Sequence, residues 1–364
     1  VSTLYPMLEG QVAALSAGAI EPEKAIEVLE ALFASDVYRP DQHSFMLYPD
    51  RKLPGYLDKN RLPSDQVETN PLIQLLLERG DRRVVERDAD GSFRFNSDFT
   101  NISDLNAQLD QVVADYGELG EAEFAQARQS LQALYEQVFD HQAFTGRSGG
   151  MFGFEGLGCI YWHMVSKLLL AVEENFFTAL HPDADAETIK KLGDLYYRVR
   201  QGIGFNKTPG AYGAFPTDPY SHTPGHAGAR QPGMTGQVKE EVITRFRELG
   251  IRVEAGAVKF MPRLLREREF VTEPRTFRYL DVDDQWQELS VPAAGLAFTW
   301  CQLPLVYRLD DYAEPSITVT REDGTQQKLP GLVLPAEQSV EVFLRSGRIR
   351  RLDLVFASSA LFSE

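Results

Sequence analysis

The chain has 364 residues, 43% of them hydrophobic and 25% charged, a composition typical of a globular protein long enough for two or three domains. Its net charge of −16 at pH 7 argues against nucleic acid or an anionic membrane as a partner, because a negative field attracts neither. A local basic pocket for an anionic substrate remains compatible with this charge. No stretch approaches the ~20 apolar residues of a membrane span, and no signal peptide opens the chain.

The two cysteines, Cys159 and Cys301, are too few for a disulfide framework and stand in apolar surroundings. We therefore expect a reducing compartment, with the cytoplasm as the predicted location. The chain begins with Val1 rather than Met, so we also expect a trimmed chain or a part of a larger polypeptide. In that case the missing signal peptide carries no information about secretion.

Helical periodicity dominates the first 250 residues. Apolar residues recur at three- and four-residue spacing over residues 8–15, 26–33, 105–116, 124–138, 160–180 and 187–200, and again over 237–249, where Gly250 is a suitable C-cap. Asn70-Pro71 opens a short helix, and Asp90-Gly91 supplies the turn of a small hairpin over residues 84–95. The regular apolar stripe over residues 160–180 predicts the best-defined helix of the chain.

Strand patterns begin at residue 251. Alternating apolar and β-branched residues predict strands at 252–260, 276–280, 297–301, 316–320, 339–344 and 349–356, with a hairpin turn at Glu322-Asp-Gly-Thr. Helices followed by strands indicate an α+β protein, with a helical domain over residues 1–250 and a β-rich, sandwich-like domain over residues 251–364.

The longest irregular stretch, residues 202–236, is rich in proline, glycine and aromatic residues. Disordered segments are poor in aromatics, so we predict an ordered loop that builds a polar pocket. A second glycine-rich connector, residues 147–163, precedes the long helix, and we expect the two segments to line one cavity.

Two carboxylates, Asp218 and Glu155, stand among rings and glycines, where partial desolvation raises a carboxyl pKa and allows general-acid catalysis. Facing one another, they would provide the chemistry of glycosidic bond cleavage. The alternatives are a loop-capping role for Asp218 and an interaction of Glu155 with the dipole of the following helix.

Polar and aromatic residues of the same loop are candidate substrate ligands. Lys207, His222, His226, Arg230 and Gln231 would bind hydroxyls or phosphate, and Tyr212 and Tyr220 would stack on sugar rings. The competing interpretation is a set of solvated charges and loop histidines held by hydrogen bonds. For Trp162 and Tyr161, packing in the core of the helix is favoured over sugar stacking.

Three blocks carry a resemblance: residues 151–168, residues 204–226, and residues 231–240. They resemble the C-terminal portion of large, mostly uncharacterised bacterial proteins of the helical-toroid, carbohydrate-active type, near the cellobiose phosphorylase group. The resemblance implies a helical domain of (α/α)-toroid type. The predicted helices are fewer than a complete toroid needs, so we expect part of one, or a different helical arrangement.

The leading functional hypothesis is a glycoside phosphorylase or hydrolase acting on an oligosaccharide, with inorganic phosphate as a second substrate in phosphorolysis. Asp218 is the predicted general acid and Glu155 the second carboxylate; we expect no cofactor. The main alternative is a non-catalytic, sugar-binding or structural C-terminal region of a larger multidomain protein. We expect no metal ion, because His222 and His226 are separated by Pro224-Gly225 and spacing supplies no third ligand. A metal enzyme that uses these two histidines is the third possibility.

Overall fold

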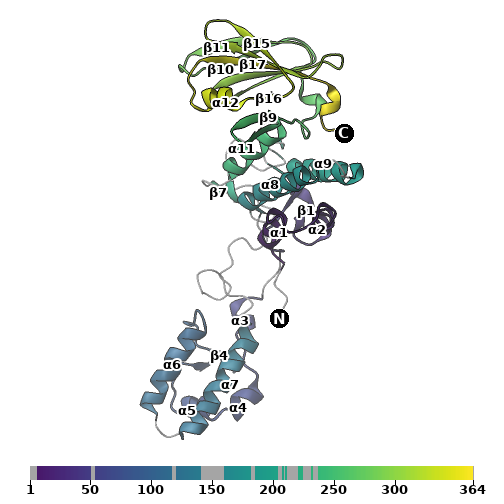
Figure 1. Ribbon diagram of the computed structural model, residues 1–364. Coiled ribbons are helices and arrows are strands. Elements are labelled where there is room, and N and C mark those ends of the chain that lie inside the picture. The colour runs from purple at the N-terminus through teal and green to yellow at the C-terminus, as the bar shows by residue number, and fades with distance from the viewer. Residues whose placement is uncertain are drawn as a thin grey trace. The chain divides into compact units, whose positions relative to one another are not determined.

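In the computed structural model the chain divides into two compact units (Figure 1). The inserted unit comprises Val1–Met7 and Met46–Cys159, and the main unit comprises Leu8–Phe45 and Ile160–Glu364. The structure describes residues 6–50, 54–116, 120–140, 160–181, 185–203, 207–208, 210, 220–223, 231–232 and 237–363. Over these residues the protein is mixed α/β, with most of its helices in the N-terminal part and most of its strands in the C-terminal part.

The inserted unit is mainly helical. Its described elements are α3 (Tyr56–Lys59), α4 (Ser64–Thr69), α5 (Pro71–Glu78), the hairpin of β3 (Val85–Arg87) and β4 (Phe93–Phe95), α6 (Ile102–Asp115) and α7 (Glu121–Phe139). Asn70 begins α5 as the sequence predicts, because its Oδ1 accepts hydrogen bonds from the backbone N–H groups of Leu72 and Ile73. Gly91, with φ of +88°, allows the tight turn of the hairpin.

One apolar core holds the inserted unit together. Leu72 and Leu76 of α5, Leu105 and Leu109 of α6, and Leu131 of α7 are all completely buried in it. These positions recur at the spacing of a helix face, so each helix buries its own apolar stripe against the others. The unit therefore has a core of its own, which the sequence analysis did not separate from the rest of the helical region.

Within the described residues, five helices of nine or more residues build the helical part of the main unit. They are α1 (Leu8–Ser16), α2 (Pro22–Ala34), α8 (Trp162–Thr178), α9 (Ala186–Gln201) and α11 (Gln237–Glu248). Between α2 and the inserted unit lie β1 (Tyr38–Arg39), the 3-10 turn η1 (Pro40–Gln42) and β2 (Ser44–Phe45). Helix α8 is the centre of this part: α1, α2, α9 and α11 all contact it, and most of its side chains are buried.

Helix α11 ends at the point where the strands begin. Gly250 follows it with φ of +94°, and a Cβ there would lie 2.5 Å from the backbone nitrogen of Pro262. Glycine is therefore required both for the left-handed conformation and for the close approach of the next segment. Strand β8 (Ile251–Glu254) follows at once, while both sides of this position belong to one compact unit, so the division into domains 1–250 and 251–364 stays a prediction.

The strand-rich part contains three described sheets. β12 (Gly295–Trp300), β13 (Leu303–Leu309), β17 (Ile349–Phe356), β14 (Ser316–Arg321) and β15 (Gln326–Pro330) form one sheet in that order. β16 (Val333–Leu334), β9 (Ala257–Phe260) and β8 (Ile251–Glu254) form the second, and β10 (Arg275–Leu280) pairs with β11 (Trp286–Val291). β13 and β17 run parallel, whereas the other pairs of these three sheets are antiparallel.

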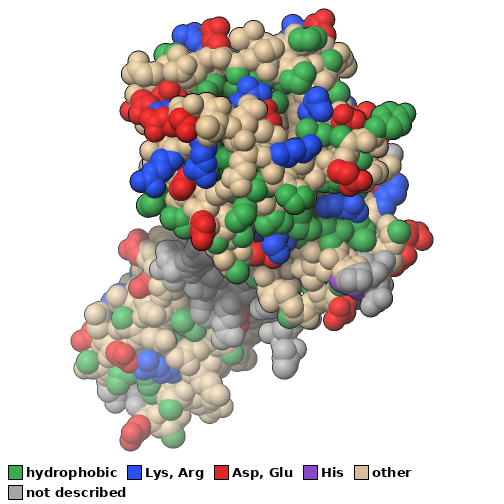
Figure 2. Space-filling view, turned by 45° about the horizontal axis from the view of Figure 1, so that its top comes forward, with side chains coloured by type: hydrophobic (Ala, Val, Ile, Leu, Met, Phe, Trp, Pro, Cys, Tyr) green, Lys and Arg blue, Asp and Glu red, His purple; other side chains and the backbone are tan. Residues whose placement is uncertain are grey.

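A single buried cluster joins the first two of these sheets. It contains Phe260 of β9, Leu334 of β16, Tyr307 of β13 and Phe356 of β17. The Tyr307 hydroxyl donates a hydrogen bond to the carbonyl oxygen of Leu249 at 2.8 Å, so the same core reaches back to the end of α11. On the exterior, basic and acidic side chains are interspersed over the face drawn in Figure 2.

One predicted strand is wrong. Residues 339–344, where Val340 and Val342 alternate with polar residues, lie mainly in helix α12 (Ala336–Phe343). Pro335 precedes the helix, and Ser339 and Val342 are buried three residues apart, which is helical spacing. The Ser339 hydroxyl accepts a hydrogen bond from the Val258 backbone N–H at 3.0 Å, which fixes the helix on β9.

Cys301 is half-buried, beside the apolar cluster of the strand-rich part, rather than fully enclosed, and Cys159 lies outside the described residues. Among the helices that the structure describes, none is both long and apolar enough to cross a membrane.

Candidate functional site

Two segments far apart in the sequence meet in a small antiparallel sheet at the start of α8. β5 (Ile160–Tyr161) closes the glycine-rich connector, and β6 (Tyr220–Thr223) and β7 (Gln231–Pro232) belong to the proline-rich loop. Ile160 pairs with Thr223, and Tyr161 pairs with His222. The backbone of the loop therefore lies beside the end of the connector.

Lys207 is the predicted site residue whose side chain is fully described. Its Nζ donates a hydrogen bond to Gln42 Oε1 at 3.1 Å and lies 4.8 Å from the centroid of the Trp162 ring. Trp162 is completely buried, as the sequence analysis favours, and presents its ring face to the ammonium group. The lysine thus reaches from the loop to both η1 and the first residue of α8.

Burial dominates the electrostatics of Lys207. It lowers the pKa of the amine to about 8, and although Asp41 acts in the opposite direction, Arg39 adds to the lowering. Arg39 is itself held by Asp41, with Nε at 2.9 Å from Oδ1 and Nη2 at 3.1 Å from Oδ2. At neutral pH Lys207 is therefore mostly charged.

The end of α9 sets the position of the segment that carries Lys207. Gly202 follows α9, and a Cβ at that position would lie 2.2 Å from the carbonyl oxygen of His43. His43 itself adopts a left-handed conformation, with φ of +49°. This close backbone contact brings the chain after α9 against η1, five residues before Lys207.

The starts of α8 and α11 lie at the same end of the helical part. His163 near the start of α8 interacts electrostatically with Glu240 near the start of α11, and Glu173 near the end of α8 lies 3.7 Å from Arg247 near the end of α11. The two helices therefore run in the same direction. Their positive ends point toward the region of the β5–β6–β7 sheet, an arrangement that favours an anion.

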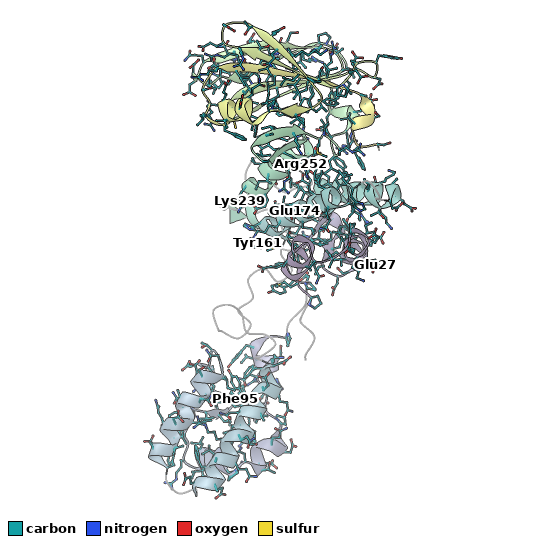
Figure 3. The ribbon with its side chains drawn as sticks, in the orientation of Figure 1. Glu27, Phe95, Tyr161, Glu174, Lys239 and Arg252 are labelled. Atoms are coloured by element: carbon teal, nitrogen blue, oxygen red, sulfur yellow. The ribbon has the colours of Figure 1, made fainter. Side chains whose placement is uncertain are left out.

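His163 lies on this end of the helical part. Its ring stacks on Tyr161 with a centroid distance of 5.6 Å, and burial, together with the charge of Lys167, lowers its pKa. Figure 3 labels Tyr161 at the start of α8 and Lys239 in α11. Lys239 Nζ lies 3.4 Å from Oε1 of Glu240, whose side chain is almost completely buried.

The other predicted site residues are described less completely. Tyr220, His222 and Gln231 have backbone positions in β6 and β7, and their side chains lie outside the described residues. Asp218, Glu155, Tyr212, His226 and Arg230 lie entirely outside them. The catalytic and ligand roles of all these residues therefore stay predictions. Within the described part of the chain, no group of three or more His, Cys, Asp and Glu side chains is arranged to hold a metal ion.

Sequence reasoning missed the partners of Lys207 in η1. Gln42 precedes the lysine by 165 residues, and no periodicity or motif links the two positions. Arg39 and Asp41 follow the predicted helix over residues 26–33, in a stretch where the sequence analysis predicts no element and no site residue. The packing of the α9 end on His43 brings this stretch to the site, and β2 also contacts β5 there.

Comparison with known protein families gives a match over part of the chain. Residues 53–142 match the family described as GH149 phosphorylase insertion domain 2, and they fall inside the inserted unit. The match ties the chain to GH149 phosphorylase-like proteins, the group related to cellobiose phosphorylase, in agreement with the resemblance seen in the sequence. Among curated proteins, none matches the chain.

Proposed function

We propose that the chain is part of a glycoside phosphorylase, which cleaves an oligosaccharide with inorganic phosphate. The observation that carries this proposal is the match of residues 53–142 to an insertion domain of phosphorylases. An insertion domain interrupts the chain of another domain, and here the main unit supplies sequence on both sides of it. We therefore assign the chemistry to the main unit.

The proposed site lies at the starts of α8 and α11. Two features of the described residues favour an anionic substrate there: the ammonium group of Lys207 and the positive ends of two helices that run in the same direction. Lys207, His222, His226, Arg230 and Gln231 would bind phosphate or sugar hydroxyls, and Tyr212 and Tyr220 would stack on sugar rings. The pairing of β5 with β6 supports a shared pocket, because it brings the backbones of the two segments together.

In the proposed reaction Asp218 is the general acid that protonates the departing glycosidic oxygen, and Glu155 is a second carboxylate in the pocket. When phosphate attacks in place of water, its own oxygen is the nucleophile, and the enzyme needs no second carboxylate to activate water. Glu155 would then orient the sugar through its hydroxyls. In hydrolysis, the competing reaction, Glu155 would act as the base.

For the fold we propose that the helical part of the main unit is a portion of an (α/α)-toroid. Helix α8 supports this proposal, because four other helices of the main unit contact it. We further propose that residues 251–364 form a sandwich-like accessory domain, since one apolar cluster joins two of its sheets. The predicted boundary between residues 250 and 251 separates these two parts.

The test is turnover of gluco-oligosaccharides of different linkage, with and without inorganic phosphate. Phosphorolysis releases a sugar phosphate only when phosphate is present, whereas hydrolysis releases free sugar in its absence. Asp218→Asn is expected to lower either activity by ~10²-fold or more, the scale of lost general-acid catalysis. If Asp218→Asn retained the activity of the wild type, the assignment of the acid would be wrong.

The second candidate function is a non-catalytic region of a larger polypeptide that binds sugar or stabilises its neighbours. The observation that favours it is the nature of the match, because an insertion domain is not itself a catalytic domain. Oligosaccharide binding without turnover, unchanged by Asp218→Asn, would support this function and exclude the first one for this chain.

A further inference from the structure

A cleft of about 490 Å³ opens on the main unit between the end of α9 and the segment that follows Pro262. Four arginines line it: Arg198 and Arg200 from α9, and Arg266 and Arg268 from the later segment. Asp194 is the one carboxylate among the lining residues. We call this the arginine cleft; of the candidate-site residues whose side chains the structure describes, none lines it.

Aromatic rings hold three of the four guanidinium groups in place. Arg266 lies 3.7 Å from the centroid of the Tyr197 ring, and Arg200 lies 5.7 Å from the same centroid. Arg198 lies 3.6 Å from the centroid of Phe33 in α2. Guanidinium groups stacked on rings lose little further entropy when they bind a ligand, so these arginines are better prepared for recognition than ordinary surface arginines.

The carboxylates near the cleft are already engaged. Asp194 lies 3.3 Å from Lys190, and Glu248, which is completely buried, lies 3.3 Å from Arg200 and accepts a hydrogen bond from Tyr196. Glu269 forms an ion pair with Arg245 at 2.7 Å and also lies 4.0 Å from Arg266. Glu248 and Glu269 therefore offset part of the charge of two cleft arginines, Arg200 and Arg266. The lining itself holds four arginines and one carboxylate, an excess of positive charge in a protein whose net charge is −16.

The helix dipole explains only half of this cluster. Basic residues in the last turn of a helix are stabilised by its negative end, which accounts for Arg198 and Arg200. Arg266 and Arg268 come from another segment of the chain, where no α-helix dipole acts on them; Arg266 is placed by its stacking on Tyr197 and by Glu269. Several guanidinium groups with fixed planes match the oxygens of a phosphate group, which carries two charges and accepts several hydrogen bonds.

We propose that the arginine cleft is a second ligand site, which binds a phosphate group, either free or as the monoester of a sugar. Its volume is within the range of small-molecule sites and accommodates a sugar phosphate. The inference goes beyond the proposed function, because Lys207 and Trp162, described side chains of the candidate functional site, do not line the cleft.

The test is calorimetric titration of the purified chain with inorganic phosphate and, separately, with glucose 6-phosphate, at constant ionic strength. The variant Arg198→Gln/Arg268→Gln removes two guanidinium groups from the cleft and is expected to weaken binding at least tenfold. The control Arg275→Gln/Arg308→Gln removes the same charge from two exposed arginines of the strand-rich part and is expected to leave binding unchanged. The melting temperature of each variant shows whether it is folded.

Lys207→Met separates the cleft from the candidate functional site, because it removes the lysine there and leaves the cleft intact. Binding that survives Lys207→Met and is lost in Arg198→Gln/Arg268→Gln supports the proposal. The tighter of the two probes then identifies the ligand as free phosphate or as a sugar monoester. The proposal is overturned if neither probe binds the wild type, if the control double variant weakens binding equally, or if Lys207→Met abolishes all binding.

Discussion

Buried polar side chains in the two units differ in their hydrogen bonding, as Asn60 and Asn70 of the inserted unit and Glu173 of the main unit show. In the inserted unit the Asn60 side chain donates to the Phe95 carbonyl at 2.8 Å and accepts from the Phe95 N–H at 2.9 Å, and Asn70 caps α5. In the main unit Glu173 is completely buried, and neither of its carboxyl oxygens has a hydrogen-bond partner among the described residues. The two asparagines have their hydrogen bonds satisfied, whereas Glu173 is enclosed between helices without one in the part of the chain that the structure describes.

The enclosed Glu173 marks a position where the fold accepts a loss of folding free energy. An unsatisfied buried polar group costs ~1–3 kcal/mol, so a fold retains it only where packing or function outweighs the cost. Glu173 lies between α8 and α11, the same helix pair whose starts form the candidate site. Figure 3 labels Glu174 and Arg252, the neighbours of this enclosed acid in α8 and β8. The inserted unit, by contrast, is self-sufficient in its buried hydrogen bonds at these positions.

Phe95→Ala gives the largest expected effect. Phe95 is almost completely buried, 5.1 Å from the Tyr135 ring centroid and 6.0 Å from that of Phe139. Its loss is expected to reduce the free energy of unfolding of the inserted unit by about 3–5 kcal/mol. Scanning calorimetry should show one transition moving and the transition of the main unit staying in place.

Leu57→Ala is the control in the same unit, because Leu57 is 63% exposed. We expect it to change the free energy of unfolding by less than ~0.5 kcal/mol. If Phe95→Ala displaced both transitions equally, the two units would not be energetically separate.

Glu173→Gln tests the enclosed acid through pH. Burial raises the pKa of Glu173 from 4.5 to about 9, against the opposing effect of Arg247. Between pH 4.5 and pH 9 the folded protein therefore binds one more proton at Glu173 than the unfolded chain does. The stabilising contribution of this proton is full below pH 4.5 and is lost as the pH rises through 9. Relative to Glu173→Gln, the wild type should lose up to about 1.4 kcal/mol of unfolding free energy per pH unit between pH 5 and 8.

Urea unfolding at several pH values measures this slope. Glu174→Gln is the matched control, since Glu174 is the next residue of the same helix and its side chain is 36% exposed. An equal pH dependence in Glu173→Gln and the wild type would show that Glu173 is ionised in the folded protein, contrary to our interpretation.

Gly202→Ala is expected to have a smaller effect, about 1–3 kcal/mol, because the new Cβ would overlap the carbonyl oxygen of His43 and that backbone must shift. Gly10→Ala is the opposite control: Gly10 lies in α1, where a Cβ would meet no atom within 4 Å, and alanine there should stabilise the helix by up to ~1 kcal/mol. Chemical denaturation of both variants measures the difference. Equal stabilities would mean that the α9 end is not held tightly against His43.

Local patterns predicted most of the regular elements. The apolar stripe of α8, the Asn70-Pro71 start of α5, the Asp90-Gly91 turn and the Gly250 C-cap are all found where the sequence places them. These features depend on neighbouring residues, so the sequence displays them directly. The strand predicted over residues 339–344 was wrong because alternating valines resemble a strand pattern. The segment instead forms helix α12, which packs on β9.

Long-range features could not be predicted in the same way. The inserted unit interrupts the main unit, and helical patterns occur both inside it and on either side of it, so periodicity does not separate the two units. Likewise, Lys207 was found as a candidate because of its loop, whereas its partner Gln42 lies 165 residues away and its burial against Trp162 follows from tertiary packing. The candidate residues were therefore identified from the composition of the loop, and the structure adds the contacts of Lys207 alone among their side chains.

The central claim is that an oligosaccharide binds beside Lys207 at the start of α8. The chain has three tryptophans, so Trp286→Phe/Trp300→Phe leaves Trp162, 4.8 Å from the lysine amine, as the reporter. In this variant, titration with gluco-oligosaccharides of different linkage should change the Trp162 fluorescence saturably for at least one of them, and adding Lys207→Met should weaken that binding at least tenfold. Fluorescence that no oligosaccharide changes, or a titration that Lys207→Met leaves as it was, would contradict the claim.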